Sequence, residues 1–361
     1  MNRDPSIPAN LRLRARGAAS NDAGRFEVQR REAAHDGWDL PEAARLLRTE
    51  VRDERPRSAL VWNRSPDLPF DRSVNPYRGC EHGCAYCYAR PSHAYLNLSP
   101  GLDFETRLIA RPGIDAVLAR EIGARGYRAA PVALGTNTDP YQPVEADRGI
   151  TRAVIAVLAA SGHPLAITTR GTLIERDIDL LAPMAARGLV RVGISVTTLD
   201  PALARRMEPR APAPARRLAV VRRLAEAGVP VRIMASPMIP GLTDHEIEAI
   251  LAAGRDAGAV AASTIPLRLP REVAGLWQDW LAREEPGRAA RVMARVRAMH
   301  GGRDYDPAFG RRMRGEGVWA DLMRRRFEAA CTRLGLAERM PPLRADLFAR
   351  PVGSGEQMRL L

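Results

Sequence analysis

Residues 79–90 read GCEHGCAYCYAR and hold three of the four cysteines in a chain of 361 residues. Cys80, Cys84 and Cys87 follow the spacing C-x3-C-x2-C, and the glycines directly before the first two permit the sharp backbone turns of so short a loop. The fourth cysteine, Cys331, is far away in the sequence, which makes a poor disulfide framework. Three clustered thiols therefore indicate a metal or redox centre.

The spacing also bears on which metal centre this is. A structural zinc site uses four ligands, usually as two separated pairs, so a lone triplet argues against zinc unless His82 or His93 is the fourth ligand. A four-iron cluster accepts thiolates at such short separations. Three cysteines on it leave one iron without a protein ligand, and that iron is available for chemistry.

The composition is that of a globular protein with a large excess of arginine. The net charge is +13, and all 55 basic residues are Arg. Arginine is concentrated in residues 201–230 and 286–326, which indicates either a basic face for a nucleic-acid backbone or solvated helix surfaces. No apolar run approaches the roughly 18 to 20 residues of a membrane span, and no secretory signal opens the chain. We expect a cytoplasmic protein with no membrane partner.

From about residue 130 a short β-like run alternates with an amphipathic helical pattern, which predicts an α/β fold with a wound parallel sheet or barrel. The predicted strands are 131–136, 165–170, 190–197, 231–236 and 260–266. In the strand 190–197, apolar residues alternate with small and polar ones, as a ligand-holding barrel interior requires. Function in such folds lies at the carboxyl ends of the strands.

Three regions follow from this pattern. Residues 1–60 mix basic and acidic residues and predict a loosely ordered extension, residues 61–270 predict the barrel, and residues 271–361 predict a basic helical extension. Within the barrel, Thr243 and Glu246 have the spacing of a helix-capping box.

The cysteine loop, with an aromatic residue before its last cysteine, resembles the radical S-adenosylmethionine (SAM) superfamily. The resemblance covers roughly residues 60–340 and is strongest to the spore photoproduct lyase-related branch, whose members are often called DNA repair photolyases. The stretches that carry it are SVNPYRGCEHGCAYCYARPSHAY, GLDFETRLIAR, GTNTDPYQPVE, VTTLDP, MEPRAPAPARRL and PMIPGLTDHE.

This resemblance implies a partial (β/α)6 barrel with a [4Fe-4S] cluster on Cys80, Cys84 and Cys87. SAM would chelate the fourth iron, and reductive cleavage would give a 5′-deoxyadenosyl radical that abstracts hydrogen from a substrate. The substrate is not readable, with DNA or RNA as candidates, and the electron donor would be a protein such as flavodoxin or ferredoxin.

The resemblance also assigns roles to single residues. Tyr86 and Tyr88 flank the third cysteine, with Tyr86 expected beside SAM and Tyr88 expected as the catalytic residue on the radical path. Four residues near strand ends are expected to bind SAM: Thr138, Asp139, Arg170 and Ser195. Arg170 stands where the family has Lys and would pair with the SAM carboxylate, and Ser195 would contact the ribose.

The chain departs from the branch at the hydrogen-donating cysteine that follows the second strand. The nearest match is Thr136, whose O–H bond is too strong to replace a thiol. We therefore expect that the chain does not repair spore photoproduct by the known route. Cys331 lies on a helical pattern and is expected to be a small buried residue rather than a substitute donor.

The roles of two motifs that contain carboxylates and arginines remain open. Glu105 is either a general base or, as is more common for a carboxylate on a short strand, the partner of a neighbouring arginine such as Arg107 or Arg111, and we expect the ion pair. Glu208 and Arg210 lie near the expected SAM site, either as a functional pair or as a structural ion pair.

Two functions of different kinds are compatible with these observations. The first is a radical SAM enzyme. The second is a basic nucleic-acid-binding protein whose cluster is structural or redox-sensing and which has no turnover. The residues expected to bind SAM favour the enzyme, because a purely structural cluster needs none of them: Tyr86, Asp139, Arg170 and Ser195.

Overall fold

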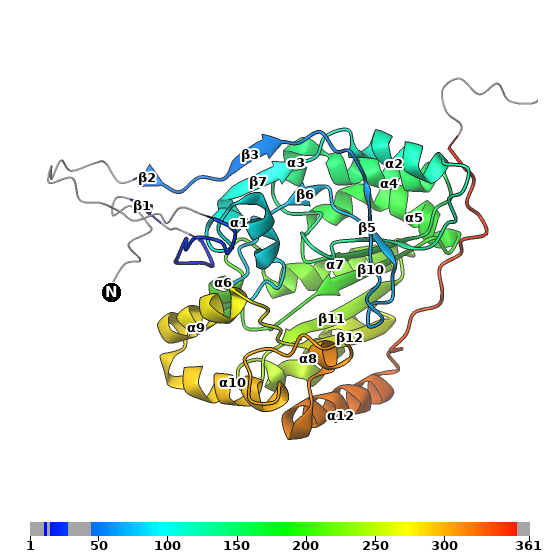
Figure 1. Cartoon of the computed structure of the whole chain (residues 1–361). Helices are drawn as coiled ribbons and strands as arrows, with labels where there is room; N and C mark the ends of the chain where they lie inside the picture. Colours follow the sequence, from blue (N-terminus) through cyan, green and yellow to red (C-terminus); the bar gives the residue numbers. More distant parts are fainter. Residues whose placement is uncertain (1–10, 13–14, 28–44, 352–361) are drawn as a thin grey trace, which may run out of the picture.

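Six parallel strands form the centre of the molecule in the computed structural model, which describes residues 11–12, 15–27 and 45–351 (Figure 1). In sheet order they are β5 (Arg72–Val74), β8 (Val132–Leu134), β9 (Leu165–Thr169), β10 (Val190–Ser195), β11 (Val231–Met238) and β12 (Ala261–Pro266). Strand β4 (Leu60–Trp62) adds to β5 in the antiparallel direction. The sheet ends at β4 and β12, so the predicted partial (β/α)6 barrel is confirmed, as are the five predicted strands.

Amphipathic helices pack on one face of this sheet. They are α2 (Ile114–Gly123), α4 (Ile150–Ala160), α5 (Ile178–Ala186), α7 (Pro214–Glu226) and α8 (Ile247–Asp256). Strand β10 shows why: Val192 and Ile194 are completely buried toward the helices, whereas Gly193 and Ser195 alternate with them on the opposite face. A Cβ on Gly193 would lie 2.5 Å from Sδ of Met234, so the inner face is closely packed even at its smallest residue.

A second, three-stranded sheet lies beside the barrel. It consists of β3 (Glu50–Asp53), β7 (Arg107–Ala110) and β6 (Tyr77–Arg78), with β3 parallel and β6 antiparallel to β7. Strand β3 lies within residues 1–60, and β4 begins at residue 60. Both pair with strands of the main fold, β3 with β7 and β4 with β5. Residues 1–10, 13–14 and 28–44 of the expected extension lie outside the described residues.

The C-terminal region is helical, as predicted. Helix α9 (Val273–Glu284) and helix α10 (Pro286–Met299) pack together, and α12 (Gly317–Leu334) packs on α8 and α10 (Figure 1). After α12, the backbone of Ala337 bonds to Val260 and Ala262 at the edge of β12. The chain then runs along the sheet, where Ala349 N donates to Ser161 O.

Cys331 lies in α12 and is 2% exposed within the main apolar core. The prediction of a buried residue is confirmed, and burial raises the pKa of its thiol to about 11. Within the described residues no helix has the length and apolar character that a membrane crossing requires.

Candidate active site

The cysteine loop follows β5 and β6 at the carboxyl end of the sheet. Gly79 and Gly83 have φ of +79° and +66°, and a Cβ on Gly83 would lie 2.6 Å from Oε2 of Glu105. The two predicted turns therefore require glycine for backbone conformation and for space. Cys80 and Cys84 are buried and Cys87 is partly exposed, and all three are free thiols.

Gln142, which the sequence did not single out, holds the start of this loop. Its Nε2 donates to Gly79 O at 3.1 Å, and its Oε1 accepts from Glu81 N at 2.9 Å. The side chain is completely buried. One amide thus fixes the backbone on both sides of Cys80, and it comes from the same loop as Asp139.

Arg90 holds the middle of the loop. Its Nε and Nη2 donate to Cys84 O at 3.0 and 2.9 Å, and its Nη1 donates to Pro100 O and Gly101 O. Its Nη2 also pairs with Oε1 of Glu105 at 2.5 Å, and neither side chain has exposed surface. The expectation for Glu105 was wrong: it lies in the short helix α1 (Asp103–Thr106), and its partner is Arg90.

The same carboxylate attaches an N-terminal segment to the cysteine loop. Gly17 N and Ala18 N donate to Glu105 at 3.0 and 2.8 Å. Gly17 passes so close to the loop that a Cβ would lie 1.7 Å from Gly83 O. The contact therefore requires glycine at position 17, and this segment covers one side of the loop.

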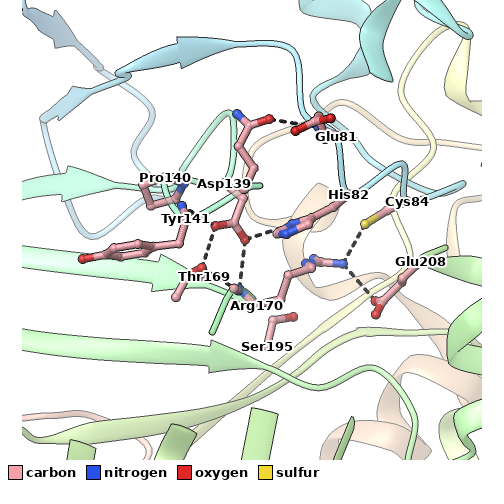
Figure 2. A network of polar contacts seen from close by, with 12 residues as sticks. Glu81, His82, Cys84, Asp139, Pro140, Tyr141, Thr169, Arg170, Ser195 and Glu208 are labelled. Carbon is pink, nitrogen blue, oxygen red and sulfur yellow. Dashed lines mark hydrogen bonds and ion pairs between the residues drawn. The ribbon is translucent and has the colours of Figure 1, made fainter. Parts of the chain in front are cut away.

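Arg170, after β9, reaches the cysteines from the other side (Figure 2). Its Nη1 lies 2.9 Å from Cys84 Sγ, 2.8 Å from Tyr86 Oη and 2.9 Å from Oε1 of Glu208. The guanidinium is thus next to one of the three thiols, where a positive charge favours the thiolate. In the protein without metal, burial raises the pKa of the Cys84 thiol to about 12, although Arg170 opposes that shift.

Glu208 is the carboxylate that organises this side of the site. It is completely buried, pairs with Arg170 and with Arg217, and accepts hydrogen bonds from Tyr86 and Thr197. Burial alone would raise the pKa of Glu208, but the two arginines lower it to about 2. The carboxylate is therefore charged and fixed.

Arg210, which the sequence suggested as a partner of Glu208, has a different partner in the structure. Arg210 pairs with Oε1 of Glu81 at 3.0 Å, and its N donates to His82 O. Glu208 and Arg210 therefore do not form a pair with each other, and Arg210 stabilises the cysteine loop instead.

Asp139 holds the backbone that presents Arg170. Its carboxylate accepts from Arg170 N at 2.9 Å and from Thr169 Oγ1 at 2.6 Å, and Nδ1 of His82 lies 3.4 Å away (Figure 2). Burial would raise the pKa of Asp139, but His82 and these donors hold it well below its usual range. Asp139 is thus an anion that connects β9 to the cysteine loop.

The remaining predicted residues lie around the same loop. Thr138 Oγ1 donates to Tyr77 O at 3.0 Å, and Ser195 Oγ donates to Ser236 O at 2.8 Å. Tyr86 is buried against Trp277 of α9, with the ring centroids 6.3 Å apart. Tyr88 is 44% exposed, and its Oη donates to Thr136 O at 2.5 Å.

The zinc alternative fits this arrangement poorly. His93 Nε2 bonds to Arg107 O at 3.0 Å, and His82 faces Asp139. In the part of the chain that the structure describes, no three Cys, His, Asp or Glu side chains are placed to share one metal ion. A four-iron cluster does not require this, because each of its thiolates binds a different iron. The donor set therefore fits a cluster with three cysteine ligands.

Comparison with known proteins supports the same family. The model of the radical SAM superfamily matches residues 74–253. An uncharacterised protein of Mycobacterium tuberculosis strain H37Rv is 40% identical over 253 residues, which are 70% of this chain and 73% of that protein. An uncharacterised protein of Methanocaldococcus jannaschii is 26% identical over 48% of this chain and 62% of its own length.

Solved structures agree at the level of the fold. A spore photoproduct lyase mutant with bound AdoMet and dinucleoside spore photoproduct has a TM-score of 0.55 at 15% identity, covering 81% of this chain and 82% of that one. A second spore photoproduct lyase mutant has a TM-score of 0.54 over the same shares of the two chains. From the matched superfamily model, the shared fold and the cysteine loop, we conclude that this chain belongs to the radical SAM superfamily.

Proposed function

We propose that Cys80, Cys84 and Cys87 hold the [4Fe-4S] cluster that the superfamily uses together with SAM. When bound, these two cofactors supply a 5′-deoxyadenosyl radical that removes a hydrogen atom from the substrate. The chain's own residues position the cofactors and the substrate and exclude water. The thiols and the side chains expected to bind SAM lie on loops at one end of the sheet, except Ser195, which is the last residue of β10.

The contact between Arg170 and Cys84 carries this proposal. A guanidinium 2.9 Å from one thiol is held by Glu208, which Arg217 holds in turn. In that position Arg170 stabilises the Cys84 thiolate and presents a cation to the carboxylate of SAM. Asp139 fixes the backbone of Arg170, in addition to the contact with SAM that we expect of Asp139.

Apolar packing behind the loop supports radical chemistry. Cys84, Ala85 and Tyr86 belong to an apolar cluster with Trp277 and Trp280 of helix α9. The two indole rings stack with centroids 4.8 Å apart. This wall, against which Cys87 also packs, keeps water from the inner side of the loop, whereas the side chain of Tyr88 is exposed.

We infer that the substrate approaches from the side of Tyr88 and that it is a nucleic acid. Tyr88 is the partly exposed tyrosine of the loop and reaches Thr136. The formal net charge of +13, which ion pairs within the chain leave unchanged, supports a polyanionic substrate.

Cysteine variants test the ligand assignment. After anaerobic reconstitution with iron and sulfide, we expect the wild type to bind about four irons per chain, and Cys80→Ala, Cys84→Ala and Cys87→Ala each to lose most of the cluster absorbance and the reduced-cluster EPR signal. Cys331→Ala is the matched control and should keep both. A full cluster in the three loop variants, or its loss in the control, would overturn the assignment.

A further inference from the structure

A cavity of about 960 Å³ opens next to the exposed side of the cysteine loop. Strands β4, β5 and β6 and the short helix η1 (Arg90–Leu96) contribute to its walls, and Thr136 and Asn137 also line it. Tyr88 donates a hydrogen bond to Thr136 O, so the cavity lies on the side of the loop from which the substrate approaches in the proposed function. We call it the β4 groove. We propose that it binds a single-stranded polynucleotide and directs one nucleotide toward Tyr88, an inference that rests on the proposed function for the reacting side.

Two exposed aromatic rings offer stacking surfaces in the β4 groove. Trp62 is 60% exposed, and the guanidinium of Arg72 lies 4.7 Å from its ring centroid. Arg72 is itself buried and paired with Asp71, so it holds the indole in place from one side. Tyr95 is 66% exposed. Exposed, fixed aromatic rings are what unpaired bases stack on, whatever their sequence.

Two arginines of the groove are free to bind phosphate. Arg55 and Arg57 line it and are exposed, and neither has a hydrogen bond or ion pair within the described part of the chain. The nearest carboxylate in the lining, Glu54, is already paired with Arg78 and Arg111. The phosphates of a nucleic-acid strand in the groove would therefore meet positive charge that no carboxylate neutralises.

Unlike Arg55 and Arg57, many arginines of the two arginine-rich segments are neutralised by carboxylates. The ion pairs formed by arginines of residues 201–230 and 286–326 include Arg206 with Glu285, Arg216 and Arg223 with Glu175, Arg297 with Asp304, Arg312 with Asp67, and Arg326 with Glu248. The density of arginine in residues 201–230 and 286–326 is therefore largely structural. The β4 groove combines free guanidinium groups with aromatic rings.

A buried acceptor in the groove has no donor. Oδ1 of Asn75, between β5 and β6, is buried and accepts no hydrogen bond within the described residues. Asn75 lines the groove, so turning its side-chain amide toward a ligand there would let the ligand supply the missing N–H. Nucleobases carry such donors on the edges that an unpaired base exposes. An acidic peptide would match Arg55 and Arg57, but it would leave the aromatic rings without a specific partner.

Binding is tested on the full-length protein with its cluster reconstituted, without reductant or SAM, so that no turnover occurs. The probes are fluorescein-labelled 12-residue oligothymidylate and oligouridylate, a duplex of the same length, and a poly-glutamate peptide, each followed by anisotropy. We expect the single strands to bind more tightly than the duplex and the peptide. Trp62→Ala should weaken single-strand binding by about 5- to 100-fold, and Trp62→Phe should weaken it less.

Salt dependence tests the phosphate contacts. Arg55→Gln combined with Arg57→Gln should reduce the slope of log affinity against log salt by about 1.4, since each phosphate contributes about 0.7 for a single strand. Matched controls lie outside the groove: Phe309→Ala, another exposed aromatic residue, and Arg324→Gln combined with Arg325→Gln. These should bind like the wild type.

Three outcomes would contradict the binding of single-stranded nucleic acid in the β4 groove. No single-strand binding at low salt, equal binding of the peptide, or losses in the controls instead of the groove variants would overturn the inference. Because binding is measured without SAM cleavage, failure here leaves the proposed radical chemistry standing, and failure of that chemistry leaves the binding result standing. The two probes also decide between DNA and RNA.

Discussion

At the scale of single residues, the ion pair of Arg90 and Glu105 controls the geometry of the cysteine loop. Both side chains are fully buried, and together they hold Cys84 O and the backbone of Gly17 and Ala18. Removing one charge leaves the other buried and unpaired, which costs about 3–5 kcal/mol. We therefore expect Glu105→Gln to lower the free energy of unfolding by about that amount, measured by urea denaturation of the metal-free protein.

Glu175→Gln is the matched control for this prediction. Glu175 also pairs with arginines, but its partners Arg216 and Arg223 have 43% and 61% of their side chains exposed. Such pairs contribute less than about 1 kcal/mol. Equal losses of stability in the two variants would show that the buried pair is no more important than a surface pair.

His163 provides a pH-dependent contribution to stability away from the site. Its Nε2 lies 2.8 Å from Tyr127 Oη and its Nδ1 3.0 Å from Pro164 O, and burial lowers the pKa of the imidazole to about 4. The unfolded chain, with a histidine pKa near 6.5, binds the proton first as pH falls. The stability from neutral His163 is therefore complete above about pH 6.5 and is lost between about pH 6.5 and 4.

The variant His163→Phe isolates this effect. Between pH 7.5 and pH 5 the wild type should lose about 2 kcal/mol more of its unfolding free energy than the variant does, because one pKa unit corresponds to about 1.4 kcal/mol. Urea unfolding at the two pH values measures the difference. Parallel losses in both proteins would contradict the assignment of a depressed pKa to His163.

The sequence predicted the residues of the site better than their partners. Asp139 and Arg170 lie together beside the cysteine loop, as expected from their places after two neighbouring strands. Gln142 and the pair of Arg90 and Glu105 were missed as loop-holding residues, because their contacts join segments whose proximity depends on the complete fold. Direct contacts with SAM or the radical remain predictions for all six expected residues, which are Tyr86, Tyr88, Thr138, Asp139, Arg170 and Ser195.

At the scale of elements, residues 15–20 and the cysteine loop form one packed unit. A Cβ on Gly17 would overlap Gly83 O, at 1.7 Å. Gly17→Ala should therefore displace the segment from the loop, lower the iron content after reconstitution by at least about half, and expose residues 15–20 to protease. Iron analysis and limited proteolysis measure the two effects.

Gly287→Ala in helix α10 is the control for this substitution. A Cβ there meets no atom within 4 Å, and alanine favours a helix over glycine. The control should keep full iron content and the same proteolytic pattern. If Gly17→Ala also behaves like the wild type, the N-terminal segment does not support the loop.

Strands were easier to predict than helix caps. Apolar residues alternate with small and polar residues in 190–197, and this alternation predicted both faces of β10 correctly. It could do so because one face packs only against helices and the other faces only the inside of the barrel. The capping box of Thr243 and Glu246 does not form. Glu246 instead accepts from Thr198 Oγ1 and Leu199 N, at 2.5 and 2.6 Å, because the neighbouring loop after β10 offers those donors. Such competition is not visible in the sequence.

At the scale of the whole molecule, the four cysteines are fully accounted for. Three lie in the loop, and the fourth is buried in α12 among core residues. Thr136 lines the groove, and it occupies the position at which the resemblance of the sequence leads us to expect a hydrogen-donating cysteine. We expect no conversion of dinucleoside spore photoproduct to thymines by the reduced enzyme with SAM, measured by chromatography. Efficient conversion would show that another hydrogen donor replaces the missing cysteine.

The central claim is that the whole arrangement produces a radical from SAM. The most direct measurement is anaerobic: the reconstituted protein is reduced, SAM is added, and 5′-deoxyadenosine is quantified beside a Cys84→Ala control. The account predicts formation by the wild type and none by the control, since Cys84 is a proposed ligand of the cluster and its Sγ lies 2.9 Å from Arg170. An intact, reduced cluster that never cleaves SAM, even with single-stranded nucleic acid present, would contradict it.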